Sequence, residues 1–185
     1  AEGYGKGASY LYYSLYATSY LRKGVRDILP RFGLSLNGGF YHALQPNRVY
    51  GAASQMSMTA YLPGFLKHQS LRLTLQEQWQ YPGQTTNHAL VNLISLPRGY
   101  RGIYGERLSR ISADYVFPLF YPDLELGGLL YVKRLRSALW TDYLSGRNVR
   151  ISTSGEYAGM QSFVSVGADI IADLHLLRIP FPLSP

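Results

Sequence analysis

Residues 70–81 read SLRLTLQEQWQY, and from Leu71 onward every second side chain is apolar, with Glu77 as the exception. The side chains in between are serine, arginine, threonine and glutamine. Because successive side chains of a β-strand point to opposite faces, this alternation predicts a strand with one apolar and one polar face. The stretch is longer than the roughly five or six residues of a typical soluble strand, and it matches the roughly 9–11 residues that cross a bilayer at a tilt.

The same alternation recurs along the chain. Residues 9–21 alternate less cleanly, and residues 124–143 change phase near residues 133–135, which predicts a β-bulge. If a truncated strand that starts at Ile179 is included, the pattern predicts about eight strands. We therefore predict an all-β fold, an antiparallel transmembrane β-barrel, in one domain over residues 1–185. The other alternating stretches are residues 31–40, 51–62, 110–121 and 163–174.

A soluble β-sandwich also alternates and is the main alternative fold. The composition favours the membrane, because charged residues make up 16% of the chain, where about a quarter is usual. The polar faces carry Gln, Ser, Thr, Arg and Asp, which suit a water-filled lumen better than a sandwich core. No apolar run is long enough for a transmembrane helix, so a membrane location rests on the strands alone.

Charge and cysteine content narrow the functional classes. The net charge is +7, but the 18 lysines and arginines are scattered and form no basic stripe, so nucleic acid is not an expected partner. The chain has no cysteine, which excludes a disulfide scaffold, a cysteine-ligated zinc site and a thiol nucleophile. An anionic membrane surface or a charged pore lining remains as the explanation of the positive charge.

The connections between the predicted strands differ in length. Pro122-Asp123 predicts a tight turn, whereas residues 82–107 form a long connection. In outer-membrane barrels short turns lie on the periplasmic side and long loops lie outside, so the long connection is expected to be extracellular in origin. Aromatic residues cluster near the predicted strand ends, as expected of interfacial girdles, and include Tyr61, Trp79 and Trp140.

The long connection holds the motif Leu96-Pro97-Arg98-Gly99-Tyr100, and the next predicted strand ends in Asp114-Tyr115-Val116-Phe117-Pro118. The following strand carries an Arg, an aromatic residue, an Asp and a closing Gly within residues 136–146, and a later strand contains residues 165–169. In this order and spacing, the four elements resemble the bacterial surface-antigen superfamily, the outer-membrane assembly and polypeptide-transport barrels. The resemblance covers roughly residues 95–185; Pro97 and Tyr100 depart from the commoner family pattern.

This resemblance implies a sixteen-stranded barrel in a Gram-negative outer membrane, of which the chain would be the C-terminal half, a fragment lacking the first strands and the closing C-terminal strand. It implies that the tip Arg98, Gly99 and Tyr100 folds into the lumen. It also implies a noncatalytic role in the insertion or translocation of polypeptides. The implied partners are outer-membrane lipid and lipopolysaccharide, nascent outer-membrane or exported polypeptides, and periplasmic or lipoprotein subunits.

An arginine inserted into a barrel needs a carboxylate partner, because a buried unpaired charge costs several kcal/mol. Asp114 and Asp142 lie on lumen-facing positions of adjacent predicted strands and are the candidates. Gly99 would let the backbone turn sharply. The alternative is a solvated surface loop in which Arg98 has no partner.

Neither an enzyme nor a metal or cofactor site is expected. The four histidines, His42, His68, His88 and His175, are dispersed and lack metal-ligand spacing. A rim site that combines Ser or Asp with His88 or His175 stays open as a minor alternative. Two noncatalytic alternatives also stay open, namely a barrel that anchors a periplasmic functional domain and a small passive structural or adhesin-like barrel.

Overall fold

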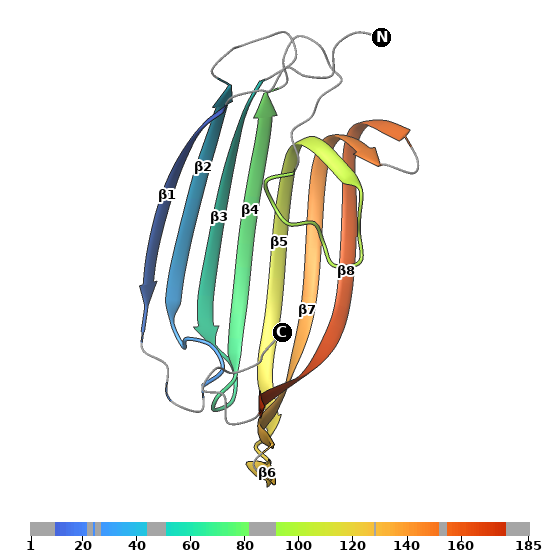
Figure 1. The fold of residues 1–185 in the computed structure, drawn as a ribbon. Coiled ribbons are helices and arrows are strands. Elements are labelled where there is room, and N and C mark those ends of the chain that lie inside the picture. The colour runs from blue at the N-terminus through green and yellow to red at the C-terminus, as the bar shows by residue number, and fades with distance from the viewer. Residues whose placement is uncertain are drawn as a thin grey trace.

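A computed structural model describes residues 10–21, 24, 27–43, 51–81, 92–127, 129–151 and 155–176, on which the following account rests (Figure 1). These residues contain no helix, and so none long and apolar enough to cross a membrane. They form a single antiparallel sheet of eight strands. The strands are β1 (Tyr10–Tyr20), β2 (Gly33–Ala43), β3 (Ala52–Pro63), β4 (Ser70–Tyr81), β5 (Ile103–Phe120), β6 (Leu124–Leu126), β7 (Leu130–Ile151) and β8 (Gly155–Leu176).

Each long strand pairs with the long strands next to it in the sequence, in the order β1-β2-β3-β4-β5-β7, and β8 follows β7. The short β6 pairs with the start of β7 and continues the place of β5 there. The predicted all-β, antiparallel fold is therefore confirmed. Within the described ranges β1 pairs only with β2 and β8 only with β7, so the sheet is open, and closure as a barrel stays a prediction.

The connection between β5 and β7 differs from the prediction in one respect. The β-bulge expected near residues 133–135 is confirmed, because the pairing of β7 with β8 shifts between Val132 and Arg134. The tight turn expected at Pro122-Asp123 is wrong, since the chain reverses only after β6, where Gly127 has a φ of +59°. Pro122 has no N–H to donate to a ladder, so it interrupts the strand without reversing it.

The last three long strands extend beyond their predicted ends. Both β7 and β8 have 22 residues, and β5 has 18 and begins at Ile103, inside the predicted long connection. The alternation in the sequence predicts strands only up to residue 143 and again from residue 163. In the structure residues 144–151 belong to β7 and residues 155–162 to β8, and the two strands stay paired on both sides of a bulge between Arg147 and Val149, with Asn148 and Gly159 at positive φ. Residues 82–91 and the strand expected from Ile179 lie outside the described residues.

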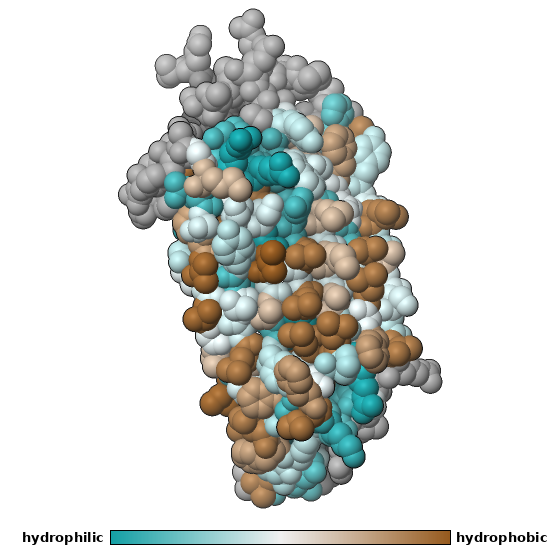
Figure 2. Space-filling view, turned by 180° about the vertical axis from the view of Figure 1, so that it is seen from behind, coloured by the Kyte–Doolittle hydropathy of each residue, from teal (hydrophilic) through white to brown (hydrophobic). Residues whose placement is uncertain are grey.

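The strand register gives the sheet two unlike faces. Leu75, Ile111, Tyr143 and Val164 are successive cross-strand partners on β4, β5, β7 and β8, and all four are 43–56% exposed. We call their side the apolar face. Figure 2 views the sheet from the side opposite to Figure 1 and shows apolar side chains gathered over its middle. The other large exposed side chains of the apolar face include Leu15, Leu36, Met56, Val166 and Ile170.

The opposite side, which we call the polar face, carries the alternate residues of each strand. Thr74, Ser112 and Asp142 are successive cross-strand partners there, on β4, β5 and β7. Residues 92–102 lie against this face and are seen in front of the sheet in Figure 1. Two of the aromatic residues expected in interfacial girdles, Tyr61 and Trp140, also lie on the polar face, the latter in the middle of β7, so that expectation is wrong for them.

Two small apolar clusters lie between the sheet and the segments that cover the polar face. In the upper cluster Ile94, from the segment before β5, packs among buried residues of β5 and β7. In the lower one Ile28, from the β1–β2 connection, packs against Val116 and Ala138. Both clusters hold a connecting segment against the strands, so covering the polar face is part of the fold. The upper cluster consists of Ile94, Ile103, Leu108, Leu144 and Val149.

Candidate functional site

The predicted motif forms a tight turn on the polar face. The amide of Tyr100 donates a hydrogen bond to the carbonyl of Pro97 at 3.1 Å, and Gly99, the third residue of the turn, has a φ of +87°. A type II turn requires positive φ at this position, which favours glycine. The glycine of the motif thus permits the tight turn, and the turn directs Arg98 toward the strands of the polar face.

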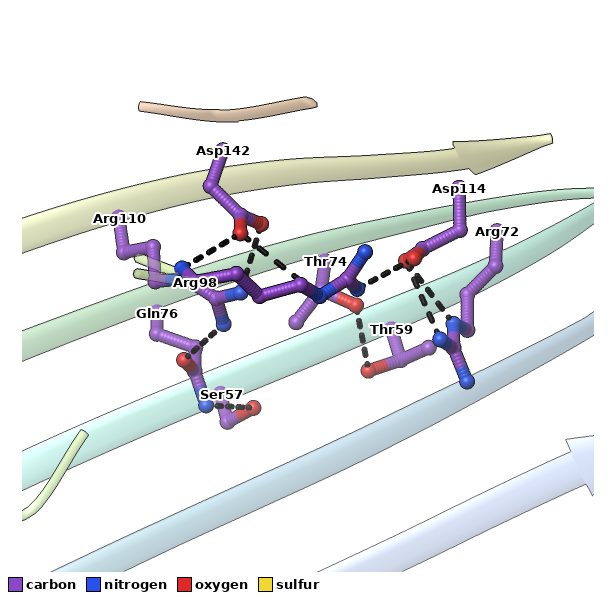
Figure 3. A network of polar contacts seen from close by, with 9 residues as sticks. All are labelled: Ser57, Thr59, Arg72, Thr74, Gln76, Arg98, Arg110, Asp114 and Asp142. Carbon is purple, nitrogen blue, oxygen red and sulfur yellow. Dashed lines mark hydrogen bonds and ion pairs between the residues drawn. The ribbon is translucent and has the colours of Figure 1, made fainter. Parts of the chain in front are cut away.

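Arg98 contacts two aspartates on neighbouring strands (Figure 3). Its backbone amide donates to Asp142 Oδ2 at 3.0 Å, and its Nε lies 3.8 Å from the same oxygen. Its Nη2 donates to Asp114 Oδ1. The structure thus brings Arg98 together with both of the carboxylates named from the sequence, and Arg98 is not the unpaired arginine of a solvated loop.

Each aspartate also has an arginine of the sheet as a partner. Arg72 on β4 donates to Asp114 Oδ2 at 3.2 Å, and Arg110 on β5 donates to Asp142 Oδ1 at 2.7 Å. Asp142 is fully buried and Asp114 is 3% exposed. Three arginines around two carboxylates leave these five side chains a formal charge of +1. We call these five residues the arginine–aspartate network.

Neutral polar side chains extend the network along the polar face. Arg110 Nη1 donates to Gln76 Oε1 at 3.0 Å, and Gln76 Nε2 reaches Ser57 Oγ at 3.5 Å. The hydroxyls of Thr59 and Thr74 lie 3.4 Å apart. Hydrogen bonds of this kind fix the side chains of β3 and β4 in the position that Arg110 requires, so the network reaches across four strands.

The guanidinium of Arg98 stacks on the indole ring of Trp140. The Arg98 Cζ atom lies 4.6 Å from the centre of the indole ring, within the range of a cation–π contact. The indole lies over Gly167, the partner of Trp140 on β8, and a Cβ built on Gly167 would come within 2.3 Å of the indole Cζ2 atom. A glycine is therefore required here by the close approach of the ring.

Further contacts fasten the segment on either side of the turn. Gln78, fully buried on β4, accepts hydrogen bonds from the amides of Leu93 and Ile94 at 2.5 and 3.3 Å and donates to the carbonyl of Gly105 at 3.2 Å. On the other side, the Tyr100 hydroxyl donates to the Val164 carbonyl at 3.1 Å. The segment is thus held from β4 to β8 and not only at its arginine.

A second cluster of charged groups lies among the connections at the other end of the sheet. Asp27, with a side chain 3% exposed, accepts hydrogen bonds from the Gly24 amide at 3.0 Å and from Arg31 Nε at 3.1 Å, and it lies 2.8 Å from His68 Nδ1. Burial alone would raise the pKa of Asp27, but these three contacts outweigh it and lower the pKa below its usual value. The cluster joins the β1–β2 connection to the β3–β4 turn.

Neither the Asp27 cluster nor the role of Gln78 could be recognised from the sequence alone. Asp27 and Arg31 are four residues apart, a spacing that could have suggested a pair, but nothing in the sequence relates them to His68. Of the other histidines, His42 stacks on Phe40 near the end of β2. His88 and the side chain of His175 lie outside the described residues, so the rim-site alternative is not tested.

The polar contacts of the site hold residues 92–100 against the sheet. Its carboxylates are each paired with arginines, so neither has a free lone-pair side aimed at open space where a substrate would lie. In the described part of the chain no three His, Asp or Glu side chains lie together in a way that could hold a metal ion. Comparisons with protein-family models, with curated proteins and with solved structures find no match for this chain. Its function must therefore be argued from its own geometry.

Replacing Gly167 by alanine should loosen the turn at residues 97–100. The added Cβ would overlap the indole of Trp140, which must move and withdraw its contact from Arg98. We expect amide hydrogen exchange in the turn to speed up about tenfold, the equivalent of one lost cation–π contact. Ala168→Val is the matched control, because Ala168 is the next residue of β8 and points to the apolar face. Unchanged exchange in Gly167→Ala would contradict the supporting role of Trp140.

The Asp27 cluster should make the β1–β2 connection sensitive to acid. Because the folded-state pKa is lowered, ionised Asp27 stabilises the fold above the pKa of the unfolded chain, about 3.9. That contribution is lost as the pH falls from there through the folded pKa. Hydrogen-exchange protection factors of residues 27–32 should therefore hold from neutral pH to about pH 5 and fall below about pH 4.

At neutral pH, Asp27→Asn should lower the free energy of local opening that these protection factors report by about 1–3 kcal/mol, because it weakens three hydrogen bonds to a buried carboxylate. It should also remove the acid step. An acid step of unchanged size in Asp27→Asn would assign the transition to another group.

Proposed function

We propose that the chain is part of a bacterial outer-membrane β-barrel, half of a sixteen-stranded one, that takes part in the insertion or translocation of polypeptides without catalysis. The observation that carries the proposal is the arginine–aspartate network. It fixes a segment between two strands against the polar face of a sheet whose other face is apolar. A polar, covered inner side and an apolar outer side are what a barrel in a membrane requires.

The apolar face supports the membrane part of the proposal. Leu15, Val166 and Ile170 are each more than 70% exposed and lie within strands. An apolar residue lies diagonally from each on the neighbouring strand, namely Leu36 for Leu15 and Leu139 for the other two. Large contiguous apolar surfaces on a folded protein indicate an interface with lipid or with another protein. Within the described residues, β1 and β8 each have one edge that pairs with no strand, and the backbone N–H and C=O groups of these edges could continue the sheet into the remaining strands of a barrel.

The covered polar face supports the part of the proposal that concerns polypeptides. A wide barrel with a free lumen would be an open pore, whereas a segment fixed across the lumen face restricts it and gives the wall one defined shape. The edges of such a wall could template strands of a client polypeptide through main-chain hydrogen bonds. Lipid, lipopolysaccharide and client polypeptides are the partners that this mechanism requires.

The experiment that tests the function uses the full-length protein reconstituted in lipid vesicles. The rate at which an unfolded outer-membrane protein inserts into the vesicles is measured for the wild type, for Arg98→Ala and for Arg101→Ala. Arg98→Ala leaves two buried carboxylates with one arginine each, and we expect it to lower the insertion rate at least tenfold and to expose residues 92–100 to protease. Arg101, an exposed arginine three residues further on, is the matched control and should change neither quantity.

Two results would contradict the proposal in different ways. An insertion rate that Arg98→Ala leaves unchanged, together with increased protease cleavage, would separate the network from polypeptide insertion. Wild-type protein that does not enter vesicles, and that migrates in detergent gels at the same position before and after heating, would contradict the barrel itself.

A further inference from the structure

Two arginines face each other across the sheet on the apolar face. Arg107 of β5 and Arg147 of β7 are direct cross-strand partners, and both are exposed. The partner of Arg107 on β4 is Trp79, and the partner of Arg147 on β8 is Met160, which is 75% exposed. These four residues form one row across four strands, which we call the arginine row.

Like charges directly opposite each other destabilise a sheet, so the pairing needs an explanation. Among the described residues neither arginine has a carboxylate partner. Two acids lie near the row: Glu77 pairs with Ser109 and so lies diagonally from Arg107, and Glu106 is exposed beside Arg107, between the inward-facing Gly105 and Leu108. Glu106, next to Arg107 in the chain, is bonded to Asn148. The row therefore carries two cations, with the half-buried carboxylate of Glu77 at its edge and the exposed carboxylate of Glu106 beside it.

The position of the row relates it to the apolar surface. The next cross-strand row along the strands holds Glu77, Ser109, Ser145 and Ser162, and the row after that is the apolar one that contains Ile111 and Tyr143. Figure 2 shows hydrophilic surface at this end of the face, above the apolar middle. The arginines thus lie four residues, about 13 Å, beyond the apolar row that contains Ile111 and Tyr143.

A guanidinium group binds phosphate through two parallel hydrogen bonds. Two guanidinium groups side by side can therefore bind one phosphate between them. Serine hydroxyls one row below would add donors, and Trp79 is an aromatic residue of the kind enriched where apolar chain meets polar headgroup. The Arg107 Cζ atom lies 5.8 Å from the centre of the Trp79 ring, so the ring also orients this arginine.

We propose that Arg107 and Arg147 form a site for the phosphate of an anionic lipid headgroup, whose acyl chains lie on the apolar face. The inference rests on the proposed function, because it requires the apolar face to meet lipid. Continuity of the arginines with that face is what selects a lipid as the source of the phosphate. The anion removes the repulsion between the two guanidinium groups, so lipid binding also stabilises the pairing of β5 with β7.

The test uses Trp79 as a reporter in the full-length protein, with Trp140 and any further tryptophan replaced by phenylalanine. The protein is reconstituted in vesicles that contain a small share of bromine-labelled phosphatidylglycerol or, in parallel, bromine-labelled phosphatidylcholine, because bromine quenches tryptophan fluorescence by contact. Each arginine near a membrane surface favours an anionic lipid about fivefold. We expect half-maximal quenching at a share of phosphatidylglycerol at least fivefold lower than that of phosphatidylcholine.

The double variant Arg107→Gln/Arg147→Gln should lose this preference, whereas Arg101→Gln, which removes a charge at the same end of the molecule, should keep it. Equal quenching by the two lipids in the unsubstituted arginine background would overturn the lipid site and leave the membrane barrel standing. Absence of quenching by either lipid would overturn the lipid site together with the membrane barrel on which it rests.

Discussion

The polar face depends on the pairing of one arginine from a loop with two aspartates from the sheet. Asp114 and Asp142 are buried, and a buried carboxylate is stable only when cations and hydrogen-bond donors surround it. Arg72 and Arg110 supply one cation to each carboxylate from within the sheet. The side chain of Arg98 supplies a further cation, and its backbone amide supplies a further hydrogen-bond donor. Strand pairing and loop position are therefore coupled: neither aspartate is fully satisfied unless the segment at residues 92–100 lies on the face.

The strand register is what allows this coupling. Because side chains alternate, the register that places Asp114 and Asp142 on one face also places Ile111, Tyr143 and Val164 on the other. A slip of one residue would move the aspartates into the apolar surface and the large apolar side chains against the loop. The same register aligns Arg107 with Arg147, so the lipid site that we propose and the arginine–aspartate network are two results of one pairing.

Much of this arrangement could be predicted from the sequence, because local patterns determine it. The alternation of residues 70–81 predicted β4 and its faces, and the phase change near residue 134 predicted the bulge in β7. The parity of Asp114 and Asp142, on neighbouring strands, was enough to name the partners of Arg98. In each case a period of two converts a sequence position into a side of the sheet.

What could not be predicted depends on contacts between distant parts of the chain. The alternation stops at residue 143 and resumes at residue 163, but pairing between β7 and β8 and the burial of Val149 extend both strands beyond these limits. Trp140 seemed suited to a membrane interface until its cross-strand partner proved to be a glycine that admits the indole. The contact of His68 with Asp27 joins two connections 41 residues apart, and no local pattern relates them.

If the chain is part of a membrane barrel, its apolar face meets lipid while its polar face meets water and residues 92–102. Since the chain has no cysteine, single cysteines can be placed along residues 162–171 of β8 in the full-length protein and labelled with a nitroxide spin label. Collision rates are then measured in vesicles with oxygen, which dissolves in lipid, and with a water-soluble nickel complex. We expect an alternation with a period of two, with oxygen favoured at positions 164, 166, 168 and 170 and low oxygen access at the positions between them. High access of the nickel complex at positions 164 to 170 without alternation would contradict it and assign the apolar face to a soluble protein.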